Sequence, residues 1–301
     1  MSVFSRVLFI TGILLFPLSS FGGDIAKFQH SLSLYLDDKG AGFQRPEGVA
    51  CNDKSLIVVG DTGNDRLLRF SFQEKTVKAA TEIKIPQLSN PICVQLNSRG
   101  EIFALDGKHR RIVRLDPEGG FKGYLAPEGM PSSSAMVPRS FKIGRDDTIY
   151  ILDIFLARVL VLDSQGKYLK QIEFPREYAF FSDLTVNSKG AVLLIDSIQA
   201  RVFSAANNAD TFSPLTGPLK EYLNFPVGIT TDKRGTIYLA DGHGGAIVIL
   251  ASDGSFLGKQ LSPGWNEGRL YYPTQICINE KDEIFIADRG NNRIQIFTVV
   301  K

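Results

Sequence analysis

An aspartate closes a short apolar run six times in this chain, at intervals of 45, 47, 43, 45 and 47 residues. The six are Asp61, Asp106, Asp153, Asp196, Asp241 and Asp288. Five of them are followed five positions later by an arginine, namely Arg66, Arg111, Arg158, Arg201 and Arg293, whereas the fifth unit has Ala246. A period of this length is typical of repeat architectures. The chain is therefore expected to consist of six copies of one unit.

Each unit reads as short strands separated by tight turns. In the first unit, Pro46 leads into an apolar run, residues 55–60 and 67–72 form two more, and Gly, Asn and Asp lie between them. A fourth run follows most units, for example at residues 121–125, 168–174 and 256–261. No helical period competes with this pattern after residue 22. Four strands in about 45 residues predict an all-β fold, a six-bladed β-propeller of four-stranded antiparallel blades.

The last unit carries a family resemblance. Residues 284–297, which read IFIADRGNNRIQIF, resemble the NHL repeat, and the resemblance extends over residues 44–301. It weakens in the third and fourth units, where Phe155 and Ile198 replace the glycine or asparagine of the turn. The resemblance implies a six-bladed propeller, in agreement with the six units. Propellers of this family serve protein binding, RNA binding and a few enzymatic reactions, so the resemblance leaves the function open.

The sixth unit has one strand too few, and this predicts how the ring is closed. The sixth unit stops at Lys301, directly after its third strand, and an open edge is prone to false pairing. Residues 28–36, which precede the first unit, alternate in character like a spare strand. We expect this N-terminal strand to become the outer strand of the sixth blade and close the ring.

Residues 1–22 have the pattern of a secretory signal peptide. Arg6 precedes an apolar stretch over residues 7–18, and small residues stand three and one positions before a cut after Gly22. A retained membrane anchor or a buried strand is the alternative. We expect removal of the signal, one domain over residues 23–301, no membrane insertion, and a monomer in the periplasm or outside the cell. These features fit an exported bacterial protein of the NHL type.

The charge balance argues against a nucleic-acid partner. Lysine and arginine number 34 and aspartate and glutamate 32, for a formal net charge of +2, and no run of like charges stands out. Binding to a phosphate backbone requires a concentrated basic face.

Three cysteines allow two interpretations. Cys51 and Cys277 lie on the first strands of the first and sixth units with opposite strand parity, so they could face each other and form a disulfide in an oxidising compartment. The favoured interpretation is that Cys51, Cys93 and Cys277 are three buried thiols that pack as small apolar residues. No CxxC spacing supports a zinc site or redox chemistry.

The recurring aspartate and arginine are interpreted as structural rather than catalytic. A residue that every unit needs solves a problem that every unit has, and here charge-assisted hydrogen bonds would order one turn. Functional residues are expected where the units differ.

The first such difference lies directly after the leading proline of each unit, or its equivalent. Glu47 and Arg139 occupy that position, and Asp183 lies one residue further along in its unit, so the three are candidates for binding a polar or charged group at the channel mouth. His109 and His243 occupy turns of the second and fifth units on the same face, too far apart for one metal ion. No histidine follows the leading prolines, where a related propeller, the peptide-amidating lyase, places its zinc ligands. We therefore expect no metal and no cofactor.

The second difference is a set of aromatic loops before the fourth, fifth and sixth units. Tyr178, Trp265 and Tyr271 are expected to be exposed contact residues, whereas Phe174 and Phe225 are expected to be buried. The leading hypothesis is an exported binding or scaffold module that presents this face to a protein or glycan partner. The alternative is a hydrolase or lyase acting at the channel mouth, with calcium as an ion that Glu47 and Asp183 could help to hold.

Overall fold

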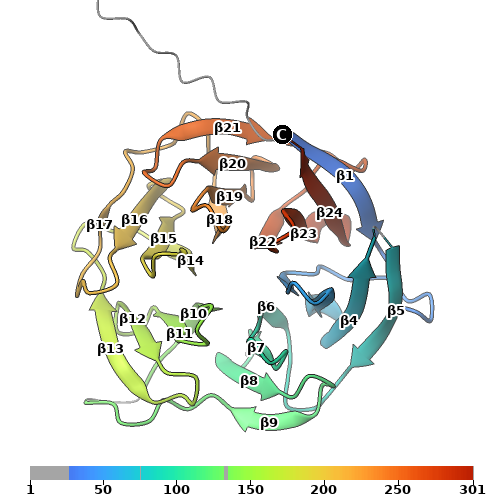
Figure 1. Cartoon of the computed structure of the whole chain (residues 1–301), viewed down its shortest axis with the longest axis horizontal. Coiled ribbons are helices and arrows are strands. Elements are labelled where there is room, and N and C mark those ends of the chain that lie inside the picture. Colours follow the sequence, from blue (N-terminus) through green and yellow to red (C-terminus); the bar gives the residue numbers. More distant parts are fainter. Residues whose placement is uncertain (1–26, 75, 132–134, 301) are drawn as a thin grey trace, which may run out of the picture.

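The computed structural model describes residues 27–74, 76–131 and 135–300, and these form six four-stranded antiparallel sheets arranged in a ring (Figure 1). The prediction of a six-bladed propeller is confirmed. The proposed signal peptide, residues 1–22, lies outside the described residues. No helix in the described part of the chain is long and apolar enough to cross a membrane.

The first strand of each blade lies innermost and the fourth outermost, as Figure 1 shows. The innermost strands are β2 (Gly48–Cys51), β6 (Pro91–Leu96), β10 (Pro138–Ile143), β14 (Phe181–Val186), β18 (Pro226–Thr231) and β22 (Pro273–Ile278). The second strands are β3 (Leu56–Asp61), β7 (Ile102–Asp106), β11 (Ile149–Asp153), β15 (Val192–Asp196), β19 (Ile237–Asp241) and β23 (Glu283–Asp288).

The third strands begin at the repeated basic position, or at Ala246 in blade five. They are β4 (Arg66–Gln73), β8 (Arg111–Leu115), β12 (Arg158–Leu162), β16 (Arg201–Ala205), β20 (Ala246–Leu250) and β24 (Arg293–Val300). The outer strands are β5 (Thr76–Ile83), β9 (Phe121–Tyr124), β13 (Tyr168–Glu173), β17 (Ser213–Pro214), β21 (Phe256–Gln260) and β1 (Lys27–Leu34). The helical segments among the described residues are two single 3-10 turns, η1 (Thr62–Asn64) and η2 (Arg289–Asn291).

The core lies between neighbouring blades. Strands β11 and β12 are buried along their whole length, because each face of a blade packs against another blade and both sets of alternating side chains are covered. One buried cluster, for example, joins Phe103 of blade two to Phe141 and Ile151 of blade three. The blades are thereby fixed relative to one another, and the loops at their ends are presented on a rigid support.

The N-terminal strand closes the ring as expected. Strand β1 pairs antiparallel with β24, from Lys27 opposite Val300 to Leu34 opposite Ile294, and Figure 1 shows the two side by side. The outer edge of blade six is therefore covered by the beginning of the chain. We call the junction between blades six and one the seam.

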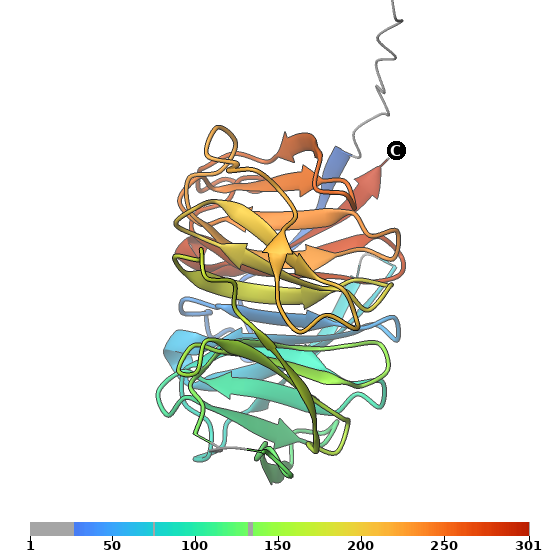
Figure 2. The ribbon, with the colours of Figure 1, turned by 90° about the vertical axis from the view of Figure 1, so that its left-hand side faces the viewer.

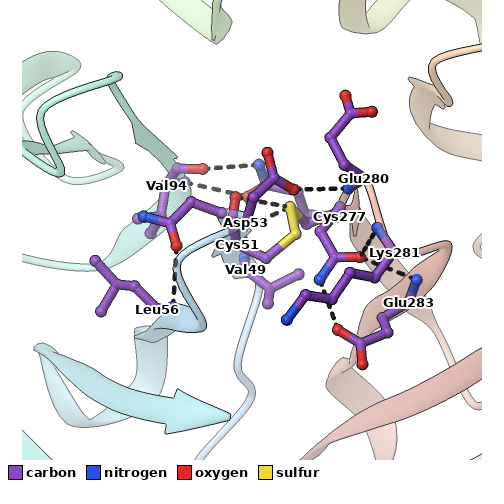
Figure 3. Close-up of a disulfide and its surroundings, with 12 residues drawn as sticks. Val49, Cys51, Asp53, Leu56, Val94, Cys277, Glu280, Lys281 and Glu283 are labelled. Carbon is purple, nitrogen blue, oxygen red and sulfur yellow. Dashed lines mark hydrogen bonds between the residues drawn. A yellow bond between two sulfur atoms is a disulfide. The ribbon is translucent and has the colours of Figure 1, made fainter. Parts of the chain in front are cut away.

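A disulfide lies at the seam, so the favoured interpretation of three buried thiols is wrong. Cys51 and Cys277 are bonded, with their Cα atoms 5.9 Å apart (Figure 3). They stand five and four residues after their leading prolines, and successive side chains of a strand point to opposite faces, so the two face each other across neighbouring blades. Cys93 is a free, buried thiol, and burial raises its pKa to about 11.

The two faces of the ring carry different loops. The strands run across the thickness of the ring (Figure 2), so the loops lie on its two opposite faces. We call one the leading face, because it carries the leading loops before the first strands and the turns between second and third strands. The opposite far face carries the turns between first and second strands.

Candidate functional site

The repeated aspartate anchors the leading loop in five of the six blades. All six aspartates are buried. Each of the five accepts at least one backbone N–H from the loop before its own first strand, and the nearest donors are Gln44, Val137, Ala179, Phe225 and Tyr271, at 2.7 to 3.0 Å. Asp106 differs, because its Oδ1 accepts the N–H groups of Lys108 and His109 in its own turn.

The expected ion pair between aspartate and arginine forms in only some blades. Arginine Nε donates to the aspartate at 2.8, 3.1 and 2.7 Å in blades one, three and six, and approaches it at 3.5 Å in blade two. Asp196 and Arg201 pair in register, yet they form no ion pair among the described residues, and Arg201 Nε is buried without a partner. In blade five, Lys259 Nζ lies 3.9 Å from Asp241 in place of the missing arginine. The aspartate is thus the constant element and the arginine a variable one.

The three channel-mouth candidates lie in one pocket on the leading face. This pocket has a volume of about 140 Å³ and is lined by Glu47, Arg139, Asp183 and Arg289, among others. They lie close together because all three stand within two residues of the leading proline, or its equivalent, where the innermost strands of blades one, three and four begin. The sequence-based grouping therefore corresponds to a real concavity, and its role in binding stays a prediction.

Asp183 forms part of the floor of this pocket. Its Oδ1 accepts the hydroxyl of Ser140 and its Oδ2 accepts the backbone N–H of Ile229 at 2.9 Å, so one carboxylate joins blades three, four and five. Burial raises its pKa, and these two hydrogen bonds oppose that effect. Because both oxygens are occupied, Asp183 is better placed to hold the floor together than to hold an ion.

Glu47 is the freer carboxylate of the pocket. Burial raises its pKa, while Arg289, Arg45 and Arg139 act to lower it, and the nearest contact is Arg289 Nε at 3.6 Å from Oε1. A half-buried carboxyl beside guanidinium groups can exchange a proton or bind a polar ligand. No group of three or more metal-ligating side chains occurs among the described residues.

The two histidines have different surroundings. His109 Nδ1 lies 2.9 Å from Asp106 Oδ2, so it holds the turn of its own blade. His243 stacks on Phe225 with ring centroids 4.8 Å apart and contacts Tyr272 edge-on at 5.8 Å. His243 is therefore part of an aromatic surface, whereas His109 is occupied locally.

That aromatic surface continues into blade six. Tyr272 contacts Tyr271 at 4.6 Å between ring centroids, and Tyr271 contacts Trp265 at 6.2 Å. We call the run Phe225, His243, Tyr272, Tyr271 and Trp265 the aromatic arc. Trp265 is 75% exposed, and Tyr271 and Tyr272 are exposed as well. The arc exists because the leading loops of blades five and six lie next to each other and each is anchored by its buried aspartate.

Tyr178 does not join the aromatic arc. It stacks on Phe181 at 5.2 Å and contacts Phe174 at 5.1 Å, in a separate cluster at the leading loop of blade four. Tyr178 is exposed, as expected. Phe174 and Phe225 are half-buried rather than buried, because each lies at the edge of its aromatic cluster.

Four exposed apolar side chains on the same face were missed as candidates. Ile154, Phe155 and Leu156 fill the turn of blade three, and Ile198 stands in the turn of blade four. Phe155 is 60% exposed and Ile198 56%. The signal was present in the sequence, since Phe155 and Ile198 replace turn residues of the repeat. We call these four residues the turn patch.

Comparison with known sequences finds a match to a known repeat family in the last unit of this chain. The sequence profile described as "NHL repeat" matches residues 270–297. NHL repeat-containing protein 3 of Homo sapiens is 29% identical over 75 residues, which cover 24% of this chain and 22% of the relative. The corresponding mouse protein gives the same identity and coverage. The match thus spans about a fifth of the length of these relatives.

Solved structures share the whole fold at low identity. A virginiamycin B lyase from Staphylococcus aureus has a TM-score of 0.64 and 18% identity over 92% of this chain and all of that one. A gluconolactonase from Xanthomonas campestris has a TM-score of 0.66 and 15% identity, covering 93% and 96% of the two chains. A PQQ-bound aldose sugar dehydrogenase from Streptomyces coelicolor has values of 0.65 and 14%, covering 92% and 99%. Similarity at this identity establishes the propeller fold and leaves the chemistry of this chain to its own residues.

Proposed function

We propose that this protein is an exported binding module that presents its leading face to a protein partner. The observation that carries the proposal is the concentration of exposed apolar and aromatic side chains there, in the turn patch, at Tyr178 and in the aromatic arc. These residues extend over blades three to six. Exposed apolar side chains gathered on one face of a soluble domain mark interaction sites, and Trp and Tyr are enriched among residues that dominate binding.

The loops of the leading face are held in place, so the face can bind a partner without a large rearrangement of these loops. The leading loops that carry Tyr178 and Tyr271 are held by buried carboxylates, Asp196 and Asp288, through backbone N–H groups. A surface fixed before binding loses less conformational entropy when it meets its partner.

Export is supported by the cysteines as well as by the first 22 residues. Disulfides persist in oxidising compartments and are rare in the cytosol, so the Cys51–Cys277 bond favours the periplasm or the extracellular space. Fusion of residues 1–30 to a reporter enzyme that is active only after export would test this, and a cytosolic reporter would contradict it.

The binding role is tested by comparing three forms of the mature chain as bait for proteins of the exported fraction. Trp265→Ala should reduce capture of a specific partner and weaken its affinity by about 2 kcal/mol, the threshold for a dominant contact residue. Leu169→Ala is the matched control, because Leu169 is 54% exposed on the outer strand β13, away from the leading face.

The same variants distinguish a glycan from a protein. Binding of the wild type to a glycan array, lost in Trp265→Ala and kept in Leu169→Ala, would transfer the proposal to a carbohydrate stacked on the aromatic arc. Equal capture by all three forms would reject the leading face as the site.

A second candidate function rests on Glu47. A carboxyl with a raised pKa, half-buried near Arg139 and Arg289, is a candidate general acid for a hydrolase or lyase at the channel mouth. In that case Glu47→Gln should abolish turnover of a lactone or ester substrate without loss of stability. Calcium is the ion to test, by calorimetric titration, and Glu47 is the acidic residue of the pocket that is free to take part in holding it.

A further inference from the structure

A large cavity opens on the far face, opposite the surface proposed above. It has a volume of about 590 Å³ and is lined by the last residues of the innermost strands and the turns that follow them. Gln275 lines both this cavity and the pocket on the leading face. Along the axis of the ring, Gln275 and Asp183 therefore lie between the pocket on the leading face and the cavity on the far face.

The deep wall of this cavity is formed by one ring of equivalent positions. Each lies four residues after the leading proline of its blade, or after Phe181 in blade four. The six are Ala50, Gln95, Lys142, Thr185, Thr230 and Cys277. Lys142 is the one charged residue in this ring. The ring therefore combines one cation, three neutral polar groups and an apolar side that ends at the disulfide seen in Figure 3.

Two polar groups of the ring are without partners. The ammonium of Lys142 makes no hydrogen bond and no ion pair within the described part of the chain, and it feels only burial and charges acting through space. Thr185 is 1% exposed, and its buried Oγ1 also lacks a partner. The two stand at equivalent positions of neighbouring strands, β10 and β14, in the same cavity. A buried hydroxyl and a largely buried ammonium both cost free energy unless they are bonded.

The carboxylates around Lys142 are committed elsewhere. Asp183 influences it through space, yet both Asp183 oxygens are bonded to Ser140 and Ile229. Burial lowers the pKa of Lys142, and Asp183 opposes this effect. The acidic residues of the cavity wall also have partners: Asp53 accepts the N–H of Glu280, Asp147 accepts from Ser98, Asp232 from Arg234, and Glu280 from Arg145.

The mouth of the cavity is crossed by an ion pair between opposite blades. Arg145 of blade three and Glu280 of blade six both line the cavity, and Arg145 Nη2 lies 2.6 Å from Glu280 Oε1. Lys233 Nζ donates to the backbone carbonyl of Glu280 at 2.6 Å. The remaining lining cation, Lys54, is exposed to water. Lys142 is therefore the deep cation that has no counter-charge of its own.

We propose that this cavity binds a small hydroxylated organic acid, with its carboxylate on Lys142 and Thr185. An ammonium and a hydroxyl supply the charge-assisted and neutral hydrogen bonds that a carboxylate accepts. Gln95 and Thr230 offer further polar contacts to hydroxyl groups, and the volume lies within the range of small-molecule sites. Lys142 is the one unpaired deep cation, since Arg145 is already paired with Glu280, and a single ammonium favours a monoanion over a phosphate.

The test is a calorimetric titration of the mature, disulfide-bonded chain with quinate, glycerate, inorganic phosphate and the neutral methyl ester of quinate. The wild type should bind a carboxylate and neither phosphate nor the ester. Lys142→Met should weaken binding about tenfold or more, the effect of removing one charged hydrogen-bonding group. Thr185→Val should weaken binding less, by about threefold to tenfold.

Lys189→Met is the matched control, because Lys189 is exposed in the far-face turn of blade four and does not line the cavity. It should bind as the wild type does. Without ligand, the Tm of Lys142→Met should not fall below that of the wild type, since the variant removes a buried charge. If Lys142→Met fails to fold, the affinity of Thr185→Val tests the proposal in its place. Failure of the wild type to bind either carboxylate, equal binding of the ester, or unchanged affinity in Lys142→Met would overturn the proposal.

Discussion

Gln275 of blade six reaches past blade one and bonds the backbone of Val94 in blade two. Its Oε1 accepts the N–H of Val94 at 3.1 Å, and its Nε2 donates to the carbonyl of Val94 at 2.9 Å. The same Oε1 accepts the N–H of Val49 in blade one, also at 3.1 Å. One side chain therefore joins three blades across the seam and separates the two concavities of the channel.

Replacement of Gln275 should weaken the ring measurably. Gln275→Leu leaves the N–H groups of Val49 and Val94 without this acceptor, so the free energy of unfolding should fall by about 2 to 4 kcal/mol. Urea denaturation followed by circular dichroism measures the change. Gln165→Leu is the control, because Gln165 is exposed and its side chain forms one long hydrogen bond among the described residues, to Ser164 at 3.4 Å. Equal midpoints for the two variants would show that the bonds of Gln275 contribute nothing.

The disulfide should stabilise the closed ring. Cys51 and Cys277 are 226 residues apart, so the bond restricts a long loop in the unfolded chain. We expect Cys51→Ala combined with Cys277→Ala to lower stability by about 2 to 4 kcal/mol. Dithiothreitol should lower the Tm of the wild type and leave the Tm of the double variant unchanged. A wild-type Tm insensitive to the reductant, under conditions where thiol titration shows full reduction, would contradict this.

Arg293 and Arg201 should respond differently to the same substitution, although they occupy the same position of the repeat. The guanidinium of Arg293 donates hydrogen bonds to Asp288, to the backbone carbonyls of Asn266 and Arg269, and to the hydroxyl of Tyr35. Arg293→Met should therefore destabilise by about 3 to 5 kcal/mol, the cost of breaking a buried ion pair.

Arg201→Met is the matched comparison. Because Arg201 forms no ion pair with Asp196, its loss should cost less than about 1 kcal/mol. Chemical denaturation of both variants decides between this view and a uniform role for the repeated arginine, which predicts equal losses.

Glu101 should make stability depend on acidity at low pH. Burial acts to raise its pKa, but hydrogen bonds from Lys122, Asn97 and Arg99 outweigh burial and lower the pKa to about 2. Because the folded-state pKa lies below the unfolded value of about 4.3, the contribution is complete above that value and is lost as the pH falls through about 2. Glu101→Gln should cost about 1 to 2 kcal/mol at pH 7, and this cost should fall towards zero as the pH drops through about 2. A constant difference across this range would contradict the assignment.

The repeat alone was sufficient to predict the architecture. Each blade carries its own strand pattern, its own proline or equivalent at the start and its own aspartate, so the blade can be identified from about 45 neighbouring residues. Even the closing strand β1 could be predicted, because a sixth unit with three strands needs a partner for its edge. The repeat also indicated that Glu47, Arg139 and Asp183 lie near one another, since the starts of the innermost strands gather around the axis of the ring, and their role in binding stays a prediction.

The remaining features required the tertiary structure. Strand parity left the pairing of Cys51 and Cys277 open, and only the approach of the two strands at the seam decided it. The sequence places Tyr178 with Trp265, whereas the packing of the leading loops separates them. The sequence also gave no sign that Lys142 and Thr185 line the same cavity, or that their polar side-chain atoms lack hydrogen-bond partners there. The blade is specified by contacts near in the chain, but the channel is formed by side chains from blades that lie far apart in sequence, and their meeting is visible only once the ring is closed.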